Sequence, residues 1–548
     1  MVAPMGVGGQ GVGGQGVVAQ AILSAERRGV LPLTSQCPFA CVFCSNRYNP
    51  RGLQVYHIGP RPMEEIQAHL EAMPPDLERV VIGESATRVN EGEPFSHPQI
   101  MPILEAVRRR FPGVVLAVTT GAPRLERTTV RRLAALAPLE VTVSLNSADP
   151  DVRRRVMGDR DALGALNTVD QLASLASDGG LTCYGSAVAL PFLVGWEDLY
   201  RTLLFLDERQ FAWARIFLPA FTRRTPESLR YPPDFPDALR GFAAQVRPEL
   251  RMPVTVEPPR VEDLGANVVG VRPGSAADRA SLRTGDVILQ VGGRTPFSRV
   301  DAHELATEAD HPAVLVRQAN PSGSLTERER ERDRASTGDG TARVTLDKGK
   351  GERPGWVMDF DIDPDRARRA AELVWHHRGR RTLVLTSELA APVVRMTLDA
   401  LEWGGLGRTG ASCGASSGSS SVGRPGGGAD VGGGVVVGNA ALEAVPNLFF
   451  GGSIAAAGLL TVGDIAAHLG WPVGEDGRPL AGMADAGSAA AAVGGTAAGG
   501  TLRPRRPRDP WPEVILLPRE PFDDSGFDLR GVSWREMAAT LRVKVDLV

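Results

Sequence analysis

Three cysteines near the beginning of the chain have the residue types and spacing best suited to chemistry. Cys37, Cys41 and Cys44 follow a C-x3-C-x2-C pattern, with Phe43 directly before the third cysteine. Thiolates are the usual protein ligands of iron–sulfur clusters. Three thiolates on a four-iron cluster leave one iron open, where a small molecule can bind directly. The spacing therefore favours a 4Fe-4S cluster with one exchangeable position.

Two other interpretations of these cysteines stay open at this level. Zinc takes four protein ligands, or three and a water molecule, but the nearest histidine is His57 and the spacing fits no common zinc finger. The cysteines could also be three buried residues that lie close together by coincidence. The remaining two, Cys183 and Cys413, lack cluster spacing, so a second cluster is not expected.

The elements that must position the cysteines follow from the apolar pattern. Short apolar runs typical of buried strands occupy 80–82, 114–118, 141–145, 186–190 and 216–218. Between them, apolar residues recur three and four positions apart, as on one face of a helix. With a strand expected before Cys37, about six strand–helix units indicate a parallel sheet with helices outside. We therefore expect an α/β fold in which residues 29–258 form a partial (β/α)6 TIM-like barrel, with its site at the carboxyl ends of the strands.

This combination of motif and fold resembles the radical S-adenosylmethionine (radical SAM) superfamily. The resemblance implies that Cys37, Cys41 and Cys44 hold a 4Fe-4S cluster, and that the open iron chelates the amine and carboxylate of S-adenosylmethionine. It further implies reductive cleavage of S-adenosylmethionine to a 5′-deoxyadenosyl radical, which abstracts hydrogen from a substrate. The reductant that the resemblance implies is a ferredoxin or flavodoxin.

A second segment carries the resemblance. EGEPFSHP, which begins at residue 91, resembles the Gly-Gly-Glu-Pro element of the superfamily, with Gly92 and Glu93 in the matching positions. In the superfamily this glutamate helps to hold the methionine amine. Glu84, near the end of the preceding strand, is a rival for the role. Each glutamate is equally well explained as a loop or helix-entry residue.

A third segment, VTVSLNSADPDVRRRVMG, resembles the fourth-strand element of the superfamily. By this resemblance Ser144 and Asn146 face the cofactor ribose, and Arg153 meets the methionine carboxylate through paired N–H donors. The structural alternative is a strand end followed by a helix that Asp149 caps. The next strand lacks the usual glycine signature, so the adenine contacts are not assigned.

Two further regions follow the expected barrel. Residues 259–355 contain NVVGVRPGSAADRASLRTGDVILQVGGR, which resembles a bacterial-type PDZ domain, and then a highly charged linker. PDZ domains bind extended peptides by strand addition, so this mainly-β region either captures a peptide or only packs against the barrel. Residues 356–548 resemble the uncharacterised α/β domain that accompanies radical SAM and PDZ modules. Its Gly/Ala-rich insertions, about 404–434 and 481–508, are expected to be disordered, and residues 1–28 to be a flexible Gly-rich tail.

Composition excludes several classes of partner. The 548 residues exceed what one hydrophobic core supports, so several domains are expected. The formal net charge is −3, which provides no strong basic field for nucleic acid. No apolar run is long enough to span a bilayer, and the N-terminus does not resemble a secretory signal. We expect a cytoplasmic protein without nucleic-acid or membrane partners.

The sequence thus predicts a radical SAM enzyme, in the broad class of oxidoreductases, that acts on a small-molecule or peptide substrate. If the PDZ-like region captures a peptide, the substrate is peptidyl. The alternative is an iron–sulfur scaffold or electron-transfer protein whose PDZ-like domain holds a protein partner, and a peptide-binding module with structural zinc is a third hypothesis. The sequence predicts neither the substrate nor whether S-adenosylmethionine is consumed or recycled.

Overall fold

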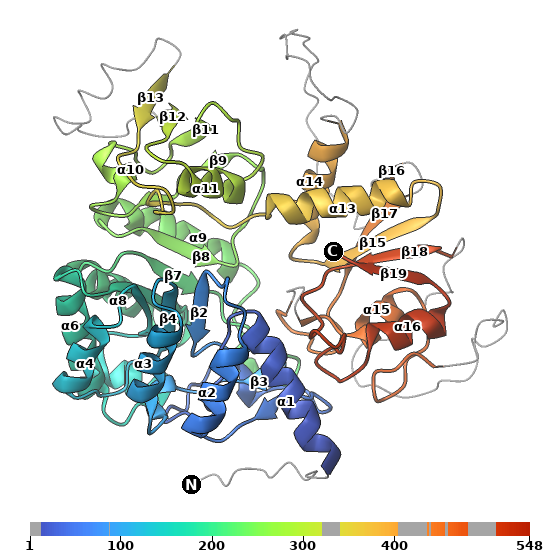
Figure 1. Cartoon of the computed structure of the whole chain (residues 1–548), viewed down its shortest axis with the longest axis horizontal. Helices are drawn as coiled ribbons and strands as arrows, with labels where there is room; N and C mark the ends of the chain where they lie inside the picture. Colours follow the sequence, from blue (N-terminus) through green and yellow to red (C-terminus); the bar gives the residue numbers. More distant parts are fainter. Residues whose placement is uncertain are drawn as a thin grey trace.

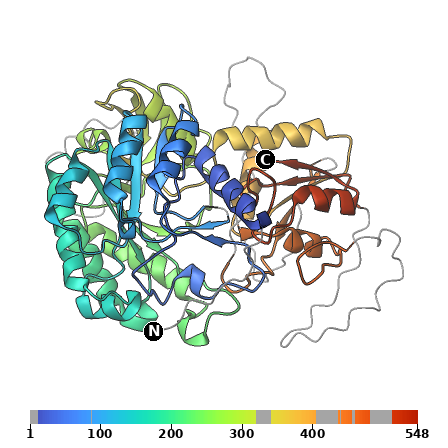
Figure 2. The same cartoon turned by 60° about the horizontal axis from the view of Figure 1, so that its bottom comes forward.

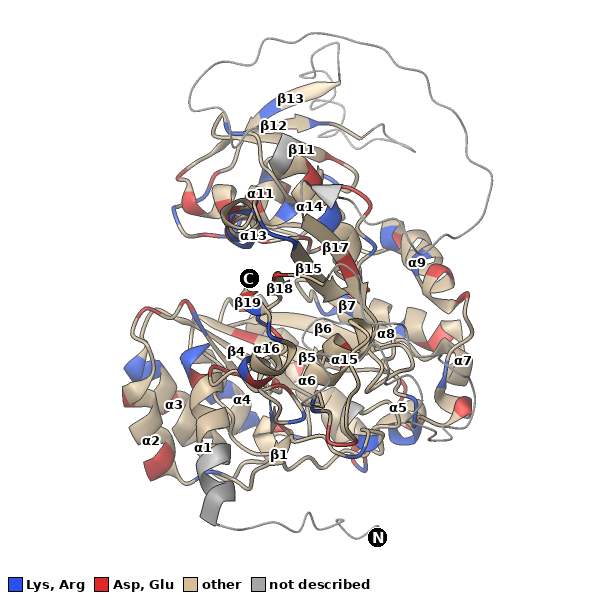
Figure 3. Ribbon diagram, turned by 90° about the vertical axis from the view of Figure 1, so that its right-hand side faces the viewer, with Lys and Arg blue, Asp and Glu red and all other residues tan. Residues whose placement is uncertain are grey.

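The computed structural model describes residues 12–86, 88–319, 340–403, 436–437, 440–454, 459–480 and 511–548. These residues form three regions that follow one another along the chain, each built around a sheet of four to six strands (Figure 1). None of the described helices is long and apolar enough to cross a membrane. Basic and acidic residues are interspersed along the elements of all three regions (Figure 3).

The first region is a parallel sheet flanked by helices. Its six strands pair in the order β2-β4-β5-β6-β7-β8, all parallel: β2 (Arg79–Ile82), β4 (Val115–Thr120), β5 (Leu139–Ser144), β6 (Thr182–Val188), β7 (Ala214–Phe217) and β8 (Val254–Glu257). The helices beside them are α2 (Met63–Ala72), α3 (Ile100–Arg110), α4 (Arg127–Ala134), α5 (Pro150–Met157), α6 (Ala162–Ser177), α7 (Pro191–Val194), α8 (Trp196–Glu208) and α9 (Phe235–Val246). Apolar residues of the strands and inner helix faces form one core. The expected α/β class with a parallel sheet is confirmed, and the arrangement is consistent with a partial TIM-like barrel.

The prediction of a strand before Cys37 was wrong. That segment makes a single parallel bridge, between Val30 and Val81, and the sixth strand of the sheet is β8 instead. Leu31 donates its N–H to the Val81 carbonyl at 2.9 Å, but Pro32 follows and has no N–H with which to continue the ladder. The chain therefore leaves the sheet five residues before the first cysteine.

The N-terminal segment also differs from the flexible tail expected over residues 1–28. Helix α1 spans Val12–Arg27, and Ala21, Ile22 and Ala25 on it are buried. Glu26 is almost fully buried as well and accepts from the Arg61 guanidinium at 2.9 Å. This apolar and ionic anchoring explains why a glycine-rich segment continues into a packed helix. Residues 1–11 lie outside the described residues.

The second region is a small antiparallel sheet with short helices. Its strands pair in the order β13-β12-β11-β9: β9 (Ala266–Asn267), β11 (Val287–Val291), β12 (Ala313–Arg317) and β13 (Thr341–Thr345). The helices are α10 (Ala276–Arg279) and α11 (Arg299–Glu308), and a separate pair joins β10 (Gly270–Val271) to β14 (Trp356–Val357). Arg353 pairs with Glu140 of the barrel at 3.0 Å. Most of the charged linker, residues 320–339, lies outside the described residues.

The third region is a mixed sheet between helices. Its strands pair in the order β16-β17-β15-β18-β19: β15 (Thr382–Ser387), β16 (Val436–Val437), β17 (Ala440–Val445), β18 (Val514–Leu517) and β19 (Lys544–Leu547). Its helices are α13 (Pro364–His376), α14 (Ala391–Trp403), α15 (Val462–His468) and α16 (Trp534–Leu541). Helix α1 lies on the side of the barrel that faces this region (Figure 2), where the Ser24 hydroxyl accepts from the Asp524 N–H at 3.1 Å. The insertions expected at 404–434 and 481–508 lie outside the described residues.

Candidate functional site

The cysteine loop (residues 35–47) lies against the segments that follow the carboxyl ends of β4 and β5. The Ala40 N–H donates to the Met157 carbonyl at 2.7 Å, and the Val42 N–H donates to the Val156 carbonyl at 2.9 Å. The ring of Phe39 packs so closely on Gly121, directly after β4, that a methyl group there would lie 2.4 Å from it. The loop therefore occupies the end of the sheet where parallel α/β proteins place their sites.

The thiols of the loop suit a cationic cluster. Cys37 is exposed, whereas Cys41 and Cys44 are partly buried. Burial raises the pKa of Cys37 to about 11, and burial together with the charges of Cys44 and Cys37 raises the pKa of Cys41 to about 12. The raised pKa values mean that Cys37 and Cys41 are neutral thiols without a metal, and binding to iron would stabilise their thiolate forms.

The donor set fits a four-iron cluster better than a single ion. Within the part of the chain that the structure describes, no three His, Cys, Asp or Glu side chains are grouped to hold one metal ion. A four-iron cluster does not require that convergence, because each thiolate binds a different iron. Three thiols on one loop are the donor set of a four-iron cluster that keeps one iron open.

Gly92 and Glu93 hold the strand-like segment that enters the cysteine loop. The Gly92 N–H donates to the Thr34 carbonyl at 2.7 Å, and the Glu93 N–H donates to the Gln36 carbonyl at 2.8 Å. The two backbones are so close that a Cβ on Gly92 would lie 2.0 Å from the Gln36 oxygen. Only glycine fits there, so this residue sets the position of the first cysteine.

Replacing Gly92 with alanine is expected to displace the cysteine loop, because the new methyl group meets backbone atoms rather than a movable side chain. The strain is about 1–3 kcal/mol or more, and a shift of about 1 Å can cost about 100-fold in rate. We expect most of the cluster iron to be lost after anaerobic reconstitution, measured as iron and sulfide per chain. Gly59→Ala is the matched control, because nothing lies within 4 Å of a Cβ there. Equal iron contents in the two variants would contradict the role of Gly92.

The Glu93 carboxylate is buried and already bonded within the protein. It accepts from the Thr120 hydroxyl at 2.6 Å, the Gly121 N–H at 2.7 Å and the Phe95 N–H at 3.1 Å. Burial raises its pKa above the usual carboxyl value, and these hydrogen bonds oppose that shift. Glu84, its rival, is exposed and accepts only from the Thr119 hydroxyl among described residues, at 3.0 Å. Of the two glutamates, the structure brings Glu93 to the cysteine loop.

Ser144 and Asn146 lie at the end of β5. The Ser144 hydroxyl bonds to the Ser186 hydroxyl at 3.2 Å, its one side-chain partner among the described residues. Asn146 has a positive φ of 60° and uses both ends of its amide internally: its oxygen accepts from the Val188 N–H at 2.9 Å, and its nitrogen donates to the Ser144 carbonyl at 3.0 Å. Ser144 is therefore the better placed of the two to meet a ligand.

Arg153 is fully buried and directed at protein atoms. Its guanidinium donates to Asp159 at 2.6 Å, to the Leu145 carbonyl at 2.6 Å and to the Gly121 carbonyl, and it lies 5.7 Å from the Phe39 ring centroid. These contacts join the ends of β4 and β5 to the cysteine loop. The guanidinium is already bonded to these protein acceptors, so it is not preorganised for the predicted bonds to a methionine carboxylate. The alternative role expected of Asp149, capping α5, is present, since it accepts from the N–H groups of residues 151 and 152.

Glu91 is a site residue that the sequence reasoning missed. Its buried carboxylate accepts from the Leu33 N–H at 3.0 Å and from the Thr34 N–H at 3.4 Å. Burial raises its pKa to about 8. Together with Gly92 and Glu93 it makes residues 91–93 a clamp on the segment before the first cysteine. A glutamate directly before the Gly-Glu pair was the available signal.

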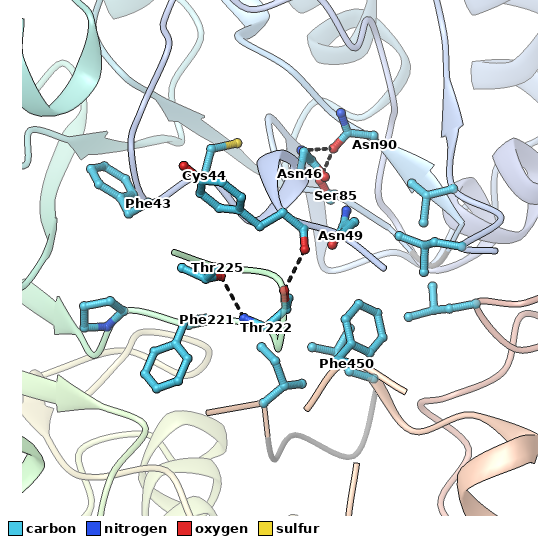
Figure 4. Close-up of a pocket in the computed structure, with 18 of the residues that line it drawn as sticks. Phe43, Cys44, Asn46, Asn49, Ser85, Asn90, Phe221, Thr222, Thr225 and Phe450 are labelled. Carbon is cyan, nitrogen blue, oxygen red and sulfur yellow. Dashed lines mark hydrogen bonds between the residues drawn. The ribbon is translucent and has the colours of Figure 1, made fainter. Parts of the chain in front are cut away.

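A cavity of about 350 Å³ adjoins the cysteine loop on the side of the third region. Figure 4 shows Phe43, Cys44 and Asn49 on one side of it, Thr222 and Thr225 opposite, and Phe450 from the third region. Small-molecule sites are concave spaces of about 300–1,000 Å³ with apolar walls and a few polar groups. The described lining is Val42, Phe43, Cys44, Asn46, Tyr48, Asn49, Leu53, Val55, Ser85, Ala86, Val89, Asn90, Leu190, Pro219, Ala220, Phe221, Thr222, Thr225, Leu229, Phe450, Ile454, Leu459, Glu520 and Leu529.

With this geometry in place, the sequence comparison decides the type of the domain. Residues 31–200, which include the three cysteines, match the family model described as the Radical SAM superfamily. The chain carries a radical SAM domain. The match concerns this domain alone and specifies no reaction subclass; the radical SAM family uses a 4Fe-4S cluster and S-adenosylmethionine as cofactors. No curated protein matches the chain.

Solved structures similar to part of this chain include two of SuiB and one of HydG. Streptococcus suis SuiB bound to S-adenosylmethionine is 18% identical, with 44% of this chain and 55% of that chain covered and a TM-score of 0.32. SuiB bound to the precursor peptide SuiA is 17% identical, with 42% and 48% covered and a TM-score of 0.32. The hydrogenase maturase HydG from Carboxydothermus hydrogenoformans is 16% identical, with 45% and 59% covered and a TM-score of 0.31. The chain spans about half the length of the solved structures it matches.

Proposed function

We propose that Cys37, Cys41 and Cys44 hold the 4Fe-4S cluster and that the enzyme uses it to initiate radical chemistry on a substrate in the adjoining cavity. When bound, the cluster would supply one electron to S-adenosylmethionine, giving methionine and a 5′-deoxyadenosyl radical that takes a hydrogen atom from the substrate. The observation that carries the proposal is the three-thiol loop at the carboxyl end of the parallel sheet, inside the matched segment 31–200.

The five residues assigned to the cofactor from sequence divide into two groups under this proposal. The Ser144 hydroxyl has capacity for a further hydrogen bond beside the one to Ser186 and is proposed to bond to the ribose. Gly92, Glu93, Asn146 and Arg153 are proposed to act by positioning, because their polar groups bind the cysteine loop or the ends of β4 and β5. This division follows from which donors and acceptors the protein has already satisfied.

The second region is proposed to be a PDZ-like module with a structural role. Its β10 edge is already paired with β14 of the same chain, with backbone bonds that include Val269 N–H to the Val357 carbonyl at 2.9 Å. Trp356 of β14 is buried in the core of the module. A peptide that used this edge would have to displace the chain's own strand. This contact supports packing against the barrel over peptide capture.

The proposal also includes the electron donor and the cellular compartment. The reductant is proposed to be a ferredoxin or flavodoxin, because the domain needs one-electron reduction at low potential. The compartment is proposed to be the cytoplasm, where a reducing environment keeps an exposed thiol such as Cys37 available for iron.

The test is made on anaerobically reconstituted protein with dithionite and S-adenosylmethionine. We expect about four irons and four sulfides per chain, and formation of methionine and 5′-deoxyadenosine in equal amounts, measured by chromatography. A fully loaded, reduced cluster that yields no 5′-deoxyadenosine would instead favour the iron–sulfur scaffold or electron-transfer protein. About one zinc per chain without iron would contradict both.

A further inference from the structure

The third region completes the wall of the cavity beside the cysteine loop. Phe450 and Leu529, from two distant parts of that region, share one apolar cluster with Leu53 and Val55, which follow the cysteine loop. The Phe450 carbonyl accepts from the Arg223 N–H at 2.8 Å. The Leu529 carbonyl accepts from the Gln54 N–H at 2.7 Å. Backbone bonds to the barrel thus fix both residues at the edge of the cavity.

Buried polar groups inside the third region hold the same wall rigid. The Asn447 side chain accepts from the Phe450 N–H at 3.0 Å and donates to the Leu459 carbonyl at 2.8 Å. The buried Asp464 carboxylate accepts from the N–H groups of Leu448 and Phe449 at 2.9 and 2.8 Å. Such fully bonded groups specify one arrangement of a loop, because breaking a bond would leave a buried polar atom unpaired. The wall is therefore built before any ligand arrives.

The described lining of the cavity is neutral apart from the cluster thiol and one carboxylate. Its other polar side chains are amides and hydroxyls: Asn46, Asn49, Asn90, Tyr48, Ser85, Thr222 and Thr225. The single carboxylate, Glu520, pairs with Arg366. No Lys, Arg, His or Asp is present in this described lining to meet a charged ligand.

Asn49 and the Tyr48 hydroxyl are polar groups of the described lining that remain available to a ligand, and of the two only Asn49 carries an amide. Its side-chain amide has no hydrogen-bond partner within the described part of the chain, whereas the hydroxyl of Thr222 donates to the Tyr48 carbonyl at 2.6 Å. An asparagine amide offers both donors and an acceptor, which matches the donor and acceptor of another amide. Asn49 and Phe450 therefore present one polar and one apolar contact across the same cavity (Figure 4).

Building on the proposed function, we infer that this cavity is the substrate site and that it selects an apolar side chain carried on uncharged amides, as in a residue inside a peptide. Phe450, Leu459 and Leu529 contact the side chain, and Asn49 bonds an amide. Zwitterionic amino acids and acidic residues are rejected, because the neutral lining would leave their charges desolvated and unpaired. The third region thus determines substrate specificity.

The test measures the binding of small compounds to the reconstituted holoenzyme in the presence of S-adenosylmethionine. Binding is measured by ligand-observed NMR titration. The compounds are N-acetyl-leucinamide, its acidic counterpart N-acetyl-glutamate amide, free leucine, and leucinamide with its cationic amine. We expect N-acetyl-leucinamide to bind about tenfold or more tightly than the three charged compounds. Comparable binding of a charged compound, or no binding by any of the four, would overturn the inference.

Two variants make the assignment to this cavity specific. Phe450→Ala is expected to weaken the binding of N-acetyl-leucinamide about tenfold. Phe360→Ala, at an exposed phenylalanine outside the cavity, is expected to leave that binding unchanged. Asn49→Asp, which keeps the shape of the residue, is expected to weaken the binding of N-acetyl-leucinamide and to strengthen the binding of cationic leucinamide. Unchanged affinities in both Phe450→Ala and Asn49→Asp would refute the site. Because 5′-deoxyadenosine formation is measured separately, failed selectivity with intact cleavage of S-adenosylmethionine refutes this inference alone.

Discussion

Cys41→Ala is expected to abolish the formation of 5′-deoxyadenosine and to lower the iron and sulfide content of the reconstituted protein. The variant removes the middle thiol of the loop, and the two remaining thiols cannot hold a four-iron cluster with a single open iron. Burial and the neighbouring charges of Cys44 and Cys37 raise the pKa of the Cys41 thiol, so all three thiols share one environment. The measurement is 5′-deoxyadenosine by chromatography with dithionite and S-adenosylmethionine, beside iron and sulfide analysis.

Cys183→Ala is the matched control for this loss. Cys183 lies in β6, is 2% exposed, and burial raises the pKa of its thiol to about 12. Cys183 belongs to the apolar core of the sheet and is not part of the cysteine loop, so it behaves as a small core residue. We expect cluster content and product yield close to wild type. Retention of both by Cys41→Ala, or their loss in Cys183→Ala, would contradict the assignment of the cluster ligands.

Local sequence signals predicted the sheet and the cysteine loop well, because both depend on short-range patterns. A run such as 141–145 is apolar throughout, as a strand buried on both faces must be, and it forms β5 over Leu139–Ser144. The strand prediction for the segment before Cys37 was wrong, because apolar content alone does not reveal that Pro32 interrupts the hydrogen-bond ladder. The sixth strand is instead β8, a strand of only four residues that pairs with β7 at the opposite edge of the sheet.

Side-chain direction was less predictable than position. Arg153 was predicted from sequence to meet a methionine carboxylate, and the structure places its guanidinium beside the ends of β4 and β5. Its guanidinium turns to Asp159, only six residues away, and to two carbonyls of the barrel. A buried arginine takes whichever acceptors satisfy its donors, and the order of residues along a helix does not specify which those are. The same limit applies to Asn146, whose amide bonds are both internal.

The cavity could not be predicted, because its walls come from distant parts of the chain. Cys44 and Leu529 line the same space although they lie in the first and third regions. No periodicity or motif near Phe450 indicates that its carbonyl will bind the Arg223 N–H. Sequence reasoning could therefore assign the initiation chemistry to the loop but left the third region without a role.

Asp523→Ala is expected to be the most destabilising change at the contact between the barrel and the third region. Asp523 accepts from Arg88 at 3.0 Å, and the two side chains are only 3% and 4% exposed. Arg88 also donates to Gln54 at 3.2 Å and to the Tyr56 hydroxyl at 2.9 Å, just behind the cavity. Removing the carboxylate leaves a buried guanidinium without its counter-charge, which costs about 3–5 kcal/mol. The measurement is the urea midpoint of unfolding.

A variant at the neighbouring Asp524 is the matched control. It distinguishes the loss of stability from breaking the buried pair from the general effect of losing a carboxylate in the same turn. Asp524 pairs with Arg28 at 2.9 Å, but the Arg28 side chain is 36% exposed and the Asp524 side chain 16%. Because water screens such a pair, Asp524→Ala is expected to cost about 0–1 kcal/mol. The double variant Asp523→Leu with Arg88→Met removes both buried charges and should recover most of the lost stability. Equal midpoints for Asp523→Ala and Asp524→Ala would show that the buried pair does not secure the third region, and with it the wall of the cavity, to the barrel.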